Sequence, residues 1–144
     1  VTQQACPMWV PLIESGEHLS DGADYFVEKY LTELLTRDPL IDTIILGCTH
    51  YPLLQPKIEA FLSSYSHSQS LIANHHISVI AQGEIVAHSL ADYLHRHPEI
   101  VERISSPSRG RSGGGFLTTE SATKFSESAS LFLAEPIQAQ HIEL

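Results

Sequence analysis

Apolar side chains recur with helical spacing over residues 21–36. They lie three and four positions apart, at Ala23, Phe26, Val27, Tyr30, Leu31, Leu34 and Leu35. This spacing places them on one face and predicts an amphipathic helix. Ser20 and Asp21 both offer an oxygen that would cap its first turn. Pro39 predicts its end, because a proline keeps the residue before it out of the helical conformation.

A short, nearly continuous apolar run follows at residues 42–47, with the sequence Asp-Thr-Ile-Ile-Leu-Gly. Runs of this kind, rich in β-branched residues, are typical of a strand that is buried on both faces, as in a parallel sheet. A second helix is predicted over residues 56–65. Pro56 is expected in its first turn, where a proline is tolerated.

Helices and strands also alternate through the rest of the chain. The further predicted elements are a strand over 77–81, a helix over 84–96 that Pro98 ends, a strand over 116–119, a helix over 120–133 and a strand over 137–144. Gly83 predicts a turn, and the residues at 105–115, rich in Ser, Gly and Arg, predict a linker or loop. Alternation of this kind predicts an α/β fold with a mainly parallel sheet flanked by helices.

The composition fits a folded protein the size of one domain, with 144 residues of which 42% are hydrophobic. The net charge of −9 comes from 8 basic and 17 acidic residues, which argues against a nucleic-acid partner. Apolar runs fall short of the roughly 18 residues that a membrane span requires, and no secretory signal is visible. We therefore expect no membrane partner and a cytoplasmic location.

Two cysteines, Cys6 and Cys48, are too few for a disulfide scaffold and lack the spacing of a structural zinc site. We expect both thiols to be free and no metal to be bound. The chain begins at Val1, and its only methionine is Met8. This suggests that the sequence is a piece of a longer chain.

Chemically reactive side chains follow the strand predicted at 42–47, in the order Gly47, Cys48, Thr49 and His50. Ligands of parallel sheets bind beyond the carboxyl ends of the strands. A neighbouring histidine and a following helix both lower the pKa of a cysteine, and the hydroxyl and backbone N–H of Thr49 offer contacts to a carboxylate. From this pattern alone, Cys48 is either a reactive thiol or a small buried apolar residue.

These residues are part of a recognisable motif. Residues 47–54, Gly-Cys-Thr-His-Tyr-Pro-Leu-Leu, resemble the signature of the cofactor-independent glutamate racemases, in the aspartate/glutamate racemase family. Residues 5–14, Ala-Cys-Pro-Met-Trp-Val-Pro-Leu-Ile-Glu, resemble a second signature of these enzymes, and residues 82–86 and 116–119 resemble later segments. The resemblance covers nearly the whole chain. His50 favours glutamate, because the related aspartate racemases typically carry Glu there.

The resemblance implies racemisation by two cysteine bases without pyridoxal phosphate or metal, which supplies D-glutamate for peptidoglycan. Cys48 matches the base that takes the α-proton from L-glutamate, and His50 matches the residue that assists it. Glu14 matches a carboxylate near this histidine and the substrate amino group. Thr49 matches a contact to the substrate carboxylate, with Cys48 beside it in the substrate site.

Half of the implied site is absent from these residues. The family's first catalytic cysteine, beside Asn and Thr, and an Asp near the N-terminus are missing, and Cys6 matches a non-catalytic cysteine. The resemblance therefore implies the C-terminal portion of a two-lobe racemase with its active site between the lobes. Residues 1–80 would belong to one lobe, and residues 81–144 would return to the other.

Such a portion is expected to be inactive alone and to need the missing N-terminal half as its partner, with a homodimer as a further expectation. Two alternatives stay open: a racemase of another amino acid such as aspartate, and a non-catalytic amino-acid binding module. Ala81, Gln82 and Ala134 differ from the usual family residues. These differences put the local turns in question.

Overall fold

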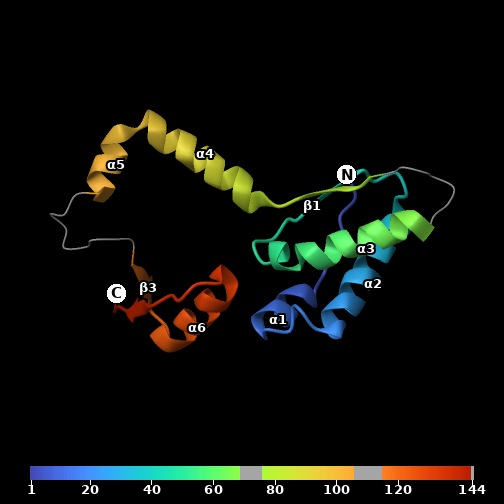
Figure 1. Ribbon diagram of the computed structural model, residues 1–144, viewed down its shortest axis with the longest axis horizontal. Coiled ribbons are helices and arrows are strands. Elements are labelled where there is room, and N and C mark those ends of the chain that lie inside the picture. The colour runs from blue at the N-terminus through green and yellow to red at the C-terminus, as the bar shows by residue number, and fades with distance from the viewer. Residues whose placement is uncertain (69–75, 106–114, 144) are drawn as a thin grey trace. The chain divides into compact units, whose positions relative to one another are not determined.

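The computed structural model describes residues 1–68, 76–105 and 115–143. They form two compact units, Val1–Ala87 and His88–Leu144. The elements, drawn in Figure 1, are α1 (Trp9–Glu14), α2 (Asp21–Arg37), β1 (Thr43–Ile45), the 3-10 helix η1 (Tyr51–Leu54), α3 (Gln55–Ser68), β2 (Ser78–Ile80), α4 (Gln82–Arg96), α5 (Pro98–Ser105), β3 (Phe116–Thr118), α6 (Ala122–Leu133) and β4 (Ala139–His141).

The first unit is built around the amphipathic helix that the sequence predicts. In α2 every residue of the predicted stripe is buried except Phe26, which is half-buried. The Ser20 hydroxyl accepts a hydrogen bond from the Ala23 N–H at 3.3 Å, so Ser20 is the cap. In Figure 1 α2 lies against both α1 and α3 in this unit. Their apolar faces form its core.

β1 and β2 pair in parallel, and Thr43, Ile44 and Ile45 lie opposite Ser78, Val79 and Ile80. The prediction of parallel strands is confirmed, but the prediction that β1 is buried on both faces is wrong. Ile44 is 8% exposed and Ile45 is 66% exposed. Successive side chains of a strand point to opposite faces, and among the described residues only the face with Ile44 is covered.

Two short helices of this unit were not predicted. α1 has six residues and η1 has four, which is too short for a periodic apolar pattern to appear. α3 is longer than the predicted helix over 56–65, and Pro56 lies in its first turn, as predicted.

Helices α4 and α5 carry exposed apolar side chains. Gly83 lies within the first turn of α4 and not in a separate turn, because Gln82 already begins the helix. Pro98 ends α4 as predicted and also begins α5, since the first helical position does not need a backbone N–H. Within the described residues Val86 and Leu90 are 60% and 54% exposed.

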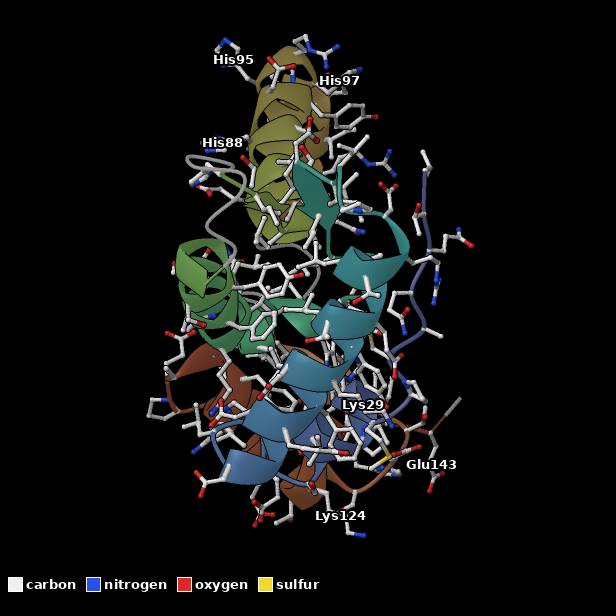
Figure 2. All side chains as sticks on the ribbon, turned by 90° about the vertical axis from the view of Figure 1, so that its right-hand side faces the viewer. Lys29, His88, His95, His97, Lys124 and Glu143 are labelled. Carbon is white, nitrogen blue, oxygen red and sulfur yellow. The ribbon has the colours of Figure 1, made fainter. Side chains whose placement is uncertain are left out.

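Histidine side chains gather where α4 ends. Figure 2 labels His95 and His97 at the same end of this helix. The His97 ring stacks on Tyr93 with 4.1 Å between ring centroids, and its Nδ1–H donates to the Tyr93 carbonyl at 2.7 Å. This bond satisfies a backbone oxygen that has no partner within the helix.

In the second unit β3 and β4 pair in parallel, with α6 between them in sequence. Ser126 and Ser130 of α6 accept hydrogen bonds from the backbone N–H groups of Ala139 and Ile137, at 3.0 and 2.9 Å. These bonds attach the last strand to the helix. The loop predicted at 105–115 falls mostly on residues 106–114, and these lie outside the described residues.

The carboxyl end of α6 has an unusual backbone. Ala134 takes a left-handed conformation, with φ of 53° and ψ of 28°. Glycine is the residue that usually ends a helix in this conformation, because a Cβ atom is disfavoured there. The sequence difference at Ala134 therefore coincides with a strained turn.

Replacing Ala134 with glycine relieves this strain. We expect Ala134→Gly to raise the free energy of unfolding by about 0.5–1 kcal/mol. The matched control is Ala129→Gly in the interior of the same helix, which should lower it by about 1 kcal/mol. Urea denaturation of the full-length protein measures both. A destabilising effect of Ala134→Gly would contradict the assignment of strain.

Candidate functional site

The reactive motif at residues 47–50 begins just beyond the carboxyl end of β1. The parallel ladder continues one residue beyond β1, where the Leu46 N–H donates to the Ile80 carbonyl at 3.0 Å. The Gln82 side-chain amide then donates to the Leu46 carbonyl at 3.2 Å. It takes the place of the next backbone N–H that a longer parallel ladder would supply. Gly47 and Cys48 follow directly. The end of the strand is thus fixed from the side of β2.

A tight turn connects this strand end to the helices. The Tyr51 N–H donates to the Cys48 carbonyl at 3.2 Å. η1 begins at Tyr51 and continues into α3, and Leu54 at the end of η1 and Ile58 in the first turn of α3 are both 0% exposed. The turn is therefore connected to β1 on one side and to η1 and α3, with their buried residues, on the other.

Glu14 reaches the same place from another part of the chain. It is the last residue of α1, directly after Ile13, which is 0% exposed. The burial of Ile13 and Trp9 fixes α1 in the core and leaves Glu14 at its rim, with a side chain that is 53% exposed.

Cys48, His50 and Glu14 form a continuous chain of polar contacts. The Cys48 Sγ lies 3.9 Å from His50 Nδ1, and His50 Nε2 lies 2.5 Å from Glu14 Oε1. Both ring nitrogens of the histidine therefore face a partner. An imidazolium would donate one N–H to a thiolate and the other to the carboxylate. We call these three residues the thiol–imidazole–carboxylate relay.

The surroundings of Cys48 favour its thiolate. The backbone N–H of His50 lowers the pKa of the thiol most, and the His50 side chain and the backbone N–H of Tyr51 lower it further, against a smaller opposing effect of burial. The pKa of His50 is raised, first by the hydrogen bond to Glu14 and then by that to Cys48. Both shifts favour the thiolate–imidazolium pair.

The other cysteine has the opposite environment. Cys6 is 7% exposed, and burial together with the Glu33 carboxylate raises the pKa of its thiol to about 12. It is therefore protonated at neutral pH. Both thiols are free, as predicted.

Thr49 is the remaining residue of the predicted site. It lies between Cys48 and His50 in the turn and is exposed. Its predicted contact to a substrate carboxylate stays a prediction.

Residues outside the predicted set support the relay. The Tyr51 N–H bonds to the Cys48 carbonyl, the Gln82 amide bonds to the Leu46 carbonyl, and the Trp9 ring meets the Tyr51 ring; sequence reasoning assigned no role to any of these three residues. Trp9 and Tyr51 lie within the two signature segments, which was the available signal.

Over residues 1–68, 76–105 and 115–143, no group of three or more His, Cys, Asp or Glu is placed to hold a metal ion. In the same part of the chain, no helix has the length and apolar character needed to cross a membrane.

Comparisons with known proteins point in one direction. No family model matches the chain. The glutamate racemase of Ruegeria pomeroyi is 35% identical over 137 residues, which are 95% of this chain and 43% of that protein. The glutamate racemase of Lactiplantibacillus plantarum is 32% identical, over 100% of this chain and 47% of its own length. The chain is related to the glutamate racemases.

Solved structures agree with these relatives. The structure of glutamate racemase isoform RacE1 from Bacillus anthracis matches 98% of this chain with a TM-score of 0.69 and 25% identity. The Thermus thermophilus glutamate racemase, solved with beta-chloro-D-alanine, matches the same share with a TM-score of 0.68. Both resemblances predicted from the sequence, to the α/β fold and to the glutamate racemases, are confirmed. The chain spans about half the length of the curated relatives it matches.

The contacts within the relay predict how the loss of the Glu14 charge changes the pKa of His50 and of Cys48. In Glu14→Gln the imidazolium of His50 loses its anionic partner, so the pKa of His50 falls and that of Cys48 rises. We expect the pH of half-maximal alkylation of Cys48 by iodoacetamide to rise by about half a unit or more. Peptide mass spectrometry on the full-length protein measures the rate at Cys48.

Glu17→Gln is the matched control, since this exposed acid lies three residues further on and outside the relay. Its profile should equal that of the wild type. Equal profiles for Glu14→Gln and wild type would show that Glu14 does not act on Cys48 through His50.

Proposed function

We propose that this chain provides one half of the active site of a glutamate racemase and acts together with an N-terminal half that supplies the opposing base. The observation that carries the proposal is the relay itself. In a chain related to glutamate racemases, a thiol of lowered pKa lies beside a histidine that a carboxylate holds.

In this proposal the Cys48 thiolate removes the α-proton of L-glutamate. The C–H bond breaks, an S–H bond forms, and the electron pair stays on the α-carbon. A proton then arrives from an acid of the N-terminal half on the opposite face, which gives D-glutamate. An α-proton is very weakly acidic, so the base needs fixed donors around the developing charge.

The other residues of the site have supporting roles. His50 holds the thiolate in place and keeps its pKa low, and Glu14 keeps His50 protonated. Thr49 offers its hydroxyl to the substrate carboxylate. Local donors of this kind are needed because the chain carries a net charge of −9, which repels an anionic substrate.

Exposed apolar surface supports the need for a second half. Ile45 on β1 and the α4 residues Val86, Leu90 and Tyr93 are 43–66% exposed in the described part of the chain. Apolar faces of this extent typically pack against another part of a protein. We propose that residues 1–80 belong to one lobe and residues 81–144 to the other, near the division into units at Ala87 and His88.

The wider role follows from the same proposal. A racemase of this kind, working in the cytoplasm, supplies D-glutamate for peptidoglycan. Substrate specificity separates it from the alternatives. A racemase of aspartate would turn over aspartate faster than glutamate, and a binding module would bind glutamate without exchanging its α-proton.

The first functional test removes the proposed base. We expect Cys48→Ala in the full-length protein to slow the exchange of the α-proton of L-glutamate in deuterated water by about 10²–10⁴-fold. NMR measures the loss of the α-proton signal. Cys6→Ala is the control and should retain wild-type exchange, because the Cys6 thiol is buried and protonated. Wild-type exchange in Cys48→Ala would refute the assignment.

The second test concerns the missing base. Purified residues 1–144 alone should not convert L-glutamate into D-glutamate, since they carry one proton-transfer group of the required pair. Circular dichroism of the product mixture over time measures conversion. Turnover above that of the Cys48→Ala variant of the same chain would contradict the two-half proposal.

A further inference from the structure

An aromatic contact between a buried and a half-buried ring joins the two segments that carry the relay. Trp9 is the first residue of α1, whose last residue is Glu14, and Tyr51 directly follows His50. The rings of Trp9 and Tyr51 meet edge to face, with 4.8 Å between centroids and an interplanar angle of 81°. The contact thus spans the same two segments as the hydrogen bond between Glu14 and His50.

The Trp9 ring is fixed by directional contacts in addition to its burial. It is 2% exposed, and its Nε1–H donates to the Phe26 carbonyl of α2 at 3.3 Å. Its ring also meets Tyr30 at 6.1 Å and 61°. Lys29, labelled in Figure 2, places its Nζ 5.9 Å from the centroid of the Tyr30 ring. The indole therefore cannot rotate without losing a hydrogen bond to α2.

On the other side of the contact, Tyr51 belongs to the backbone that faces the thiol. Its N–H bonds to the Cys48 carbonyl at 3.2 Å and is one of the backbone groups that lower the pKa of Cys48. A displacement of the Tyr51 backbone would move this N–H. The Trp9 ring thus contacts a residue whose backbone N–H acts on the thiol.

The relay is sensitive to such shifts. Glu14 and His50 are 36 residues apart in sequence and meet through one hydrogen bond at the rim of the core. The strength of a hydrogen bond falls steeply as its distance and angle depart from the optimum. A change of a few tenths of an ångström between α1 and the turn would weaken this bond first.

We propose that Trp9 is a positioning residue, which sets the distance between α1 and the turn at residues 48–51 and so aligns Glu14, His50 and Cys48. Its effect on turnover rests on the proposed function. Its effect on the thiol does not, because the state of Cys48 can be measured without any substrate.

The alternative is that Trp9 only fills volume in the core. Two variants separate the two roles. Trp9→Leu keeps an apolar side chain but removes the aromatic edge and the N–H donor. Leu35→Ala, in α2, removes a side chain that is 3% exposed and whose neighbours in sequence lie outside the relay. Both lower stability, so stability alone does not distinguish the roles.

The experiment follows the iodoacetamide alkylation of Cys48 against pH in the full-length protein, with the melting temperature of each variant. We expect Trp9→Leu to raise the pH of half-maximal alkylation by about half a unit or more. Leu35→Ala should lower the melting temperature comparably and leave the alkylation profile unchanged. Trp9→Phe, which keeps a ring edge, should recover most of the wild-type profile.

Steady-state kinetics provide the second readout. We expect Trp9→Leu to lower kcat for glutamate about 10-fold with KM changed less than about 2-fold, because proton transfer is affected more than binding. Should Trp9→Leu fail to fold, Tyr51→Leu removes the same contact from the other side and should give the same two shifts.

Three possible results test the proposed role of Trp9. A wild-type alkylation profile in folded Trp9→Leu, or in folded Tyr51→Leu, would overturn the proposal. An equal shift in Leu35→Ala would overturn it as well, since any loss of core packing would then act on the thiol. A raised alkylation midpoint in Trp9→Leu, in a protein that does not racemise glutamate, would support the role of Trp9 and refute the proposed function.

Discussion

The burial of the Trp9 indole connects the three segments on which the candidate site depends: α1, α2 and the turn before η1. Truncation of a buried tryptophan typically costs about 3–5 kcal/mol. An exposed ion pair such as that of His50 and Glu14, whose side chains are 31% and 53% exposed, contributes about 0–1 kcal/mol. Apolar packing therefore holds the relay in place, and the relay contributes little to the packing.

This order of magnitudes explains how a partly exposed polar site keeps a defined geometry. The side chains of the relay lie at the rim of the core and are partly exposed, while some residues close to them in sequence are buried. Ile13 precedes Glu14, and Leu46 lies two residues before Cys48; both are 2% exposed or less. Glu14 and Cys48 thus each follow closely on a buried apolar residue.

The two cysteines show how strongly environment determines chemistry. Cys48 meets backbone N–H groups and a histidine, and its pKa is lowered. Cys6 is 7% exposed, and burial together with the Glu33 carboxylate raises its pKa to about 12. The residue type is the same, but only Cys48 has donors directed at its sulfur. Its lowered pKa is therefore a property of the turn after β1.

Burial is unevenly distributed along the chain. Of the described residues, all those that form the buried core lie in the first unit, between Cys6 and Leu62. In the α4 and α5 helices the apolar residues Val86, Leu90, Val101 and Ile104 are 42–70% exposed. An apolar face without a covering layer lacks much of the stabilisation that folding provides. This imbalance agrees with a chain that spans about half the length of its relatives.

The sequence by itself determined the four longer helices α2, α3, α4 and α6, the parallel strands and the reactive motif. The apolar stripe of α2 has a clear period, the run at 42–47 is typical of a parallel strand, and the order Gly47, Cys48, Thr49, His50 is a local pattern. It also placed Glu14 in the site, but only through the family resemblance. Periodicity and spacing depend only on residues that are close in sequence, so the sequence alone shows them.

Only the tertiary structure decided the rest. α1 and η1 are too short to show a period, so packing against α2 and α3 determines them. The exposure of Ile45 depends on which layers cover the sheet. The residue pattern of β1 itself does not contain this information. The contact between Glu14 and His50 joins residues 36 positions apart. Its geometry depends on the core around Trp9, which forms only when distant apolar segments are buried together.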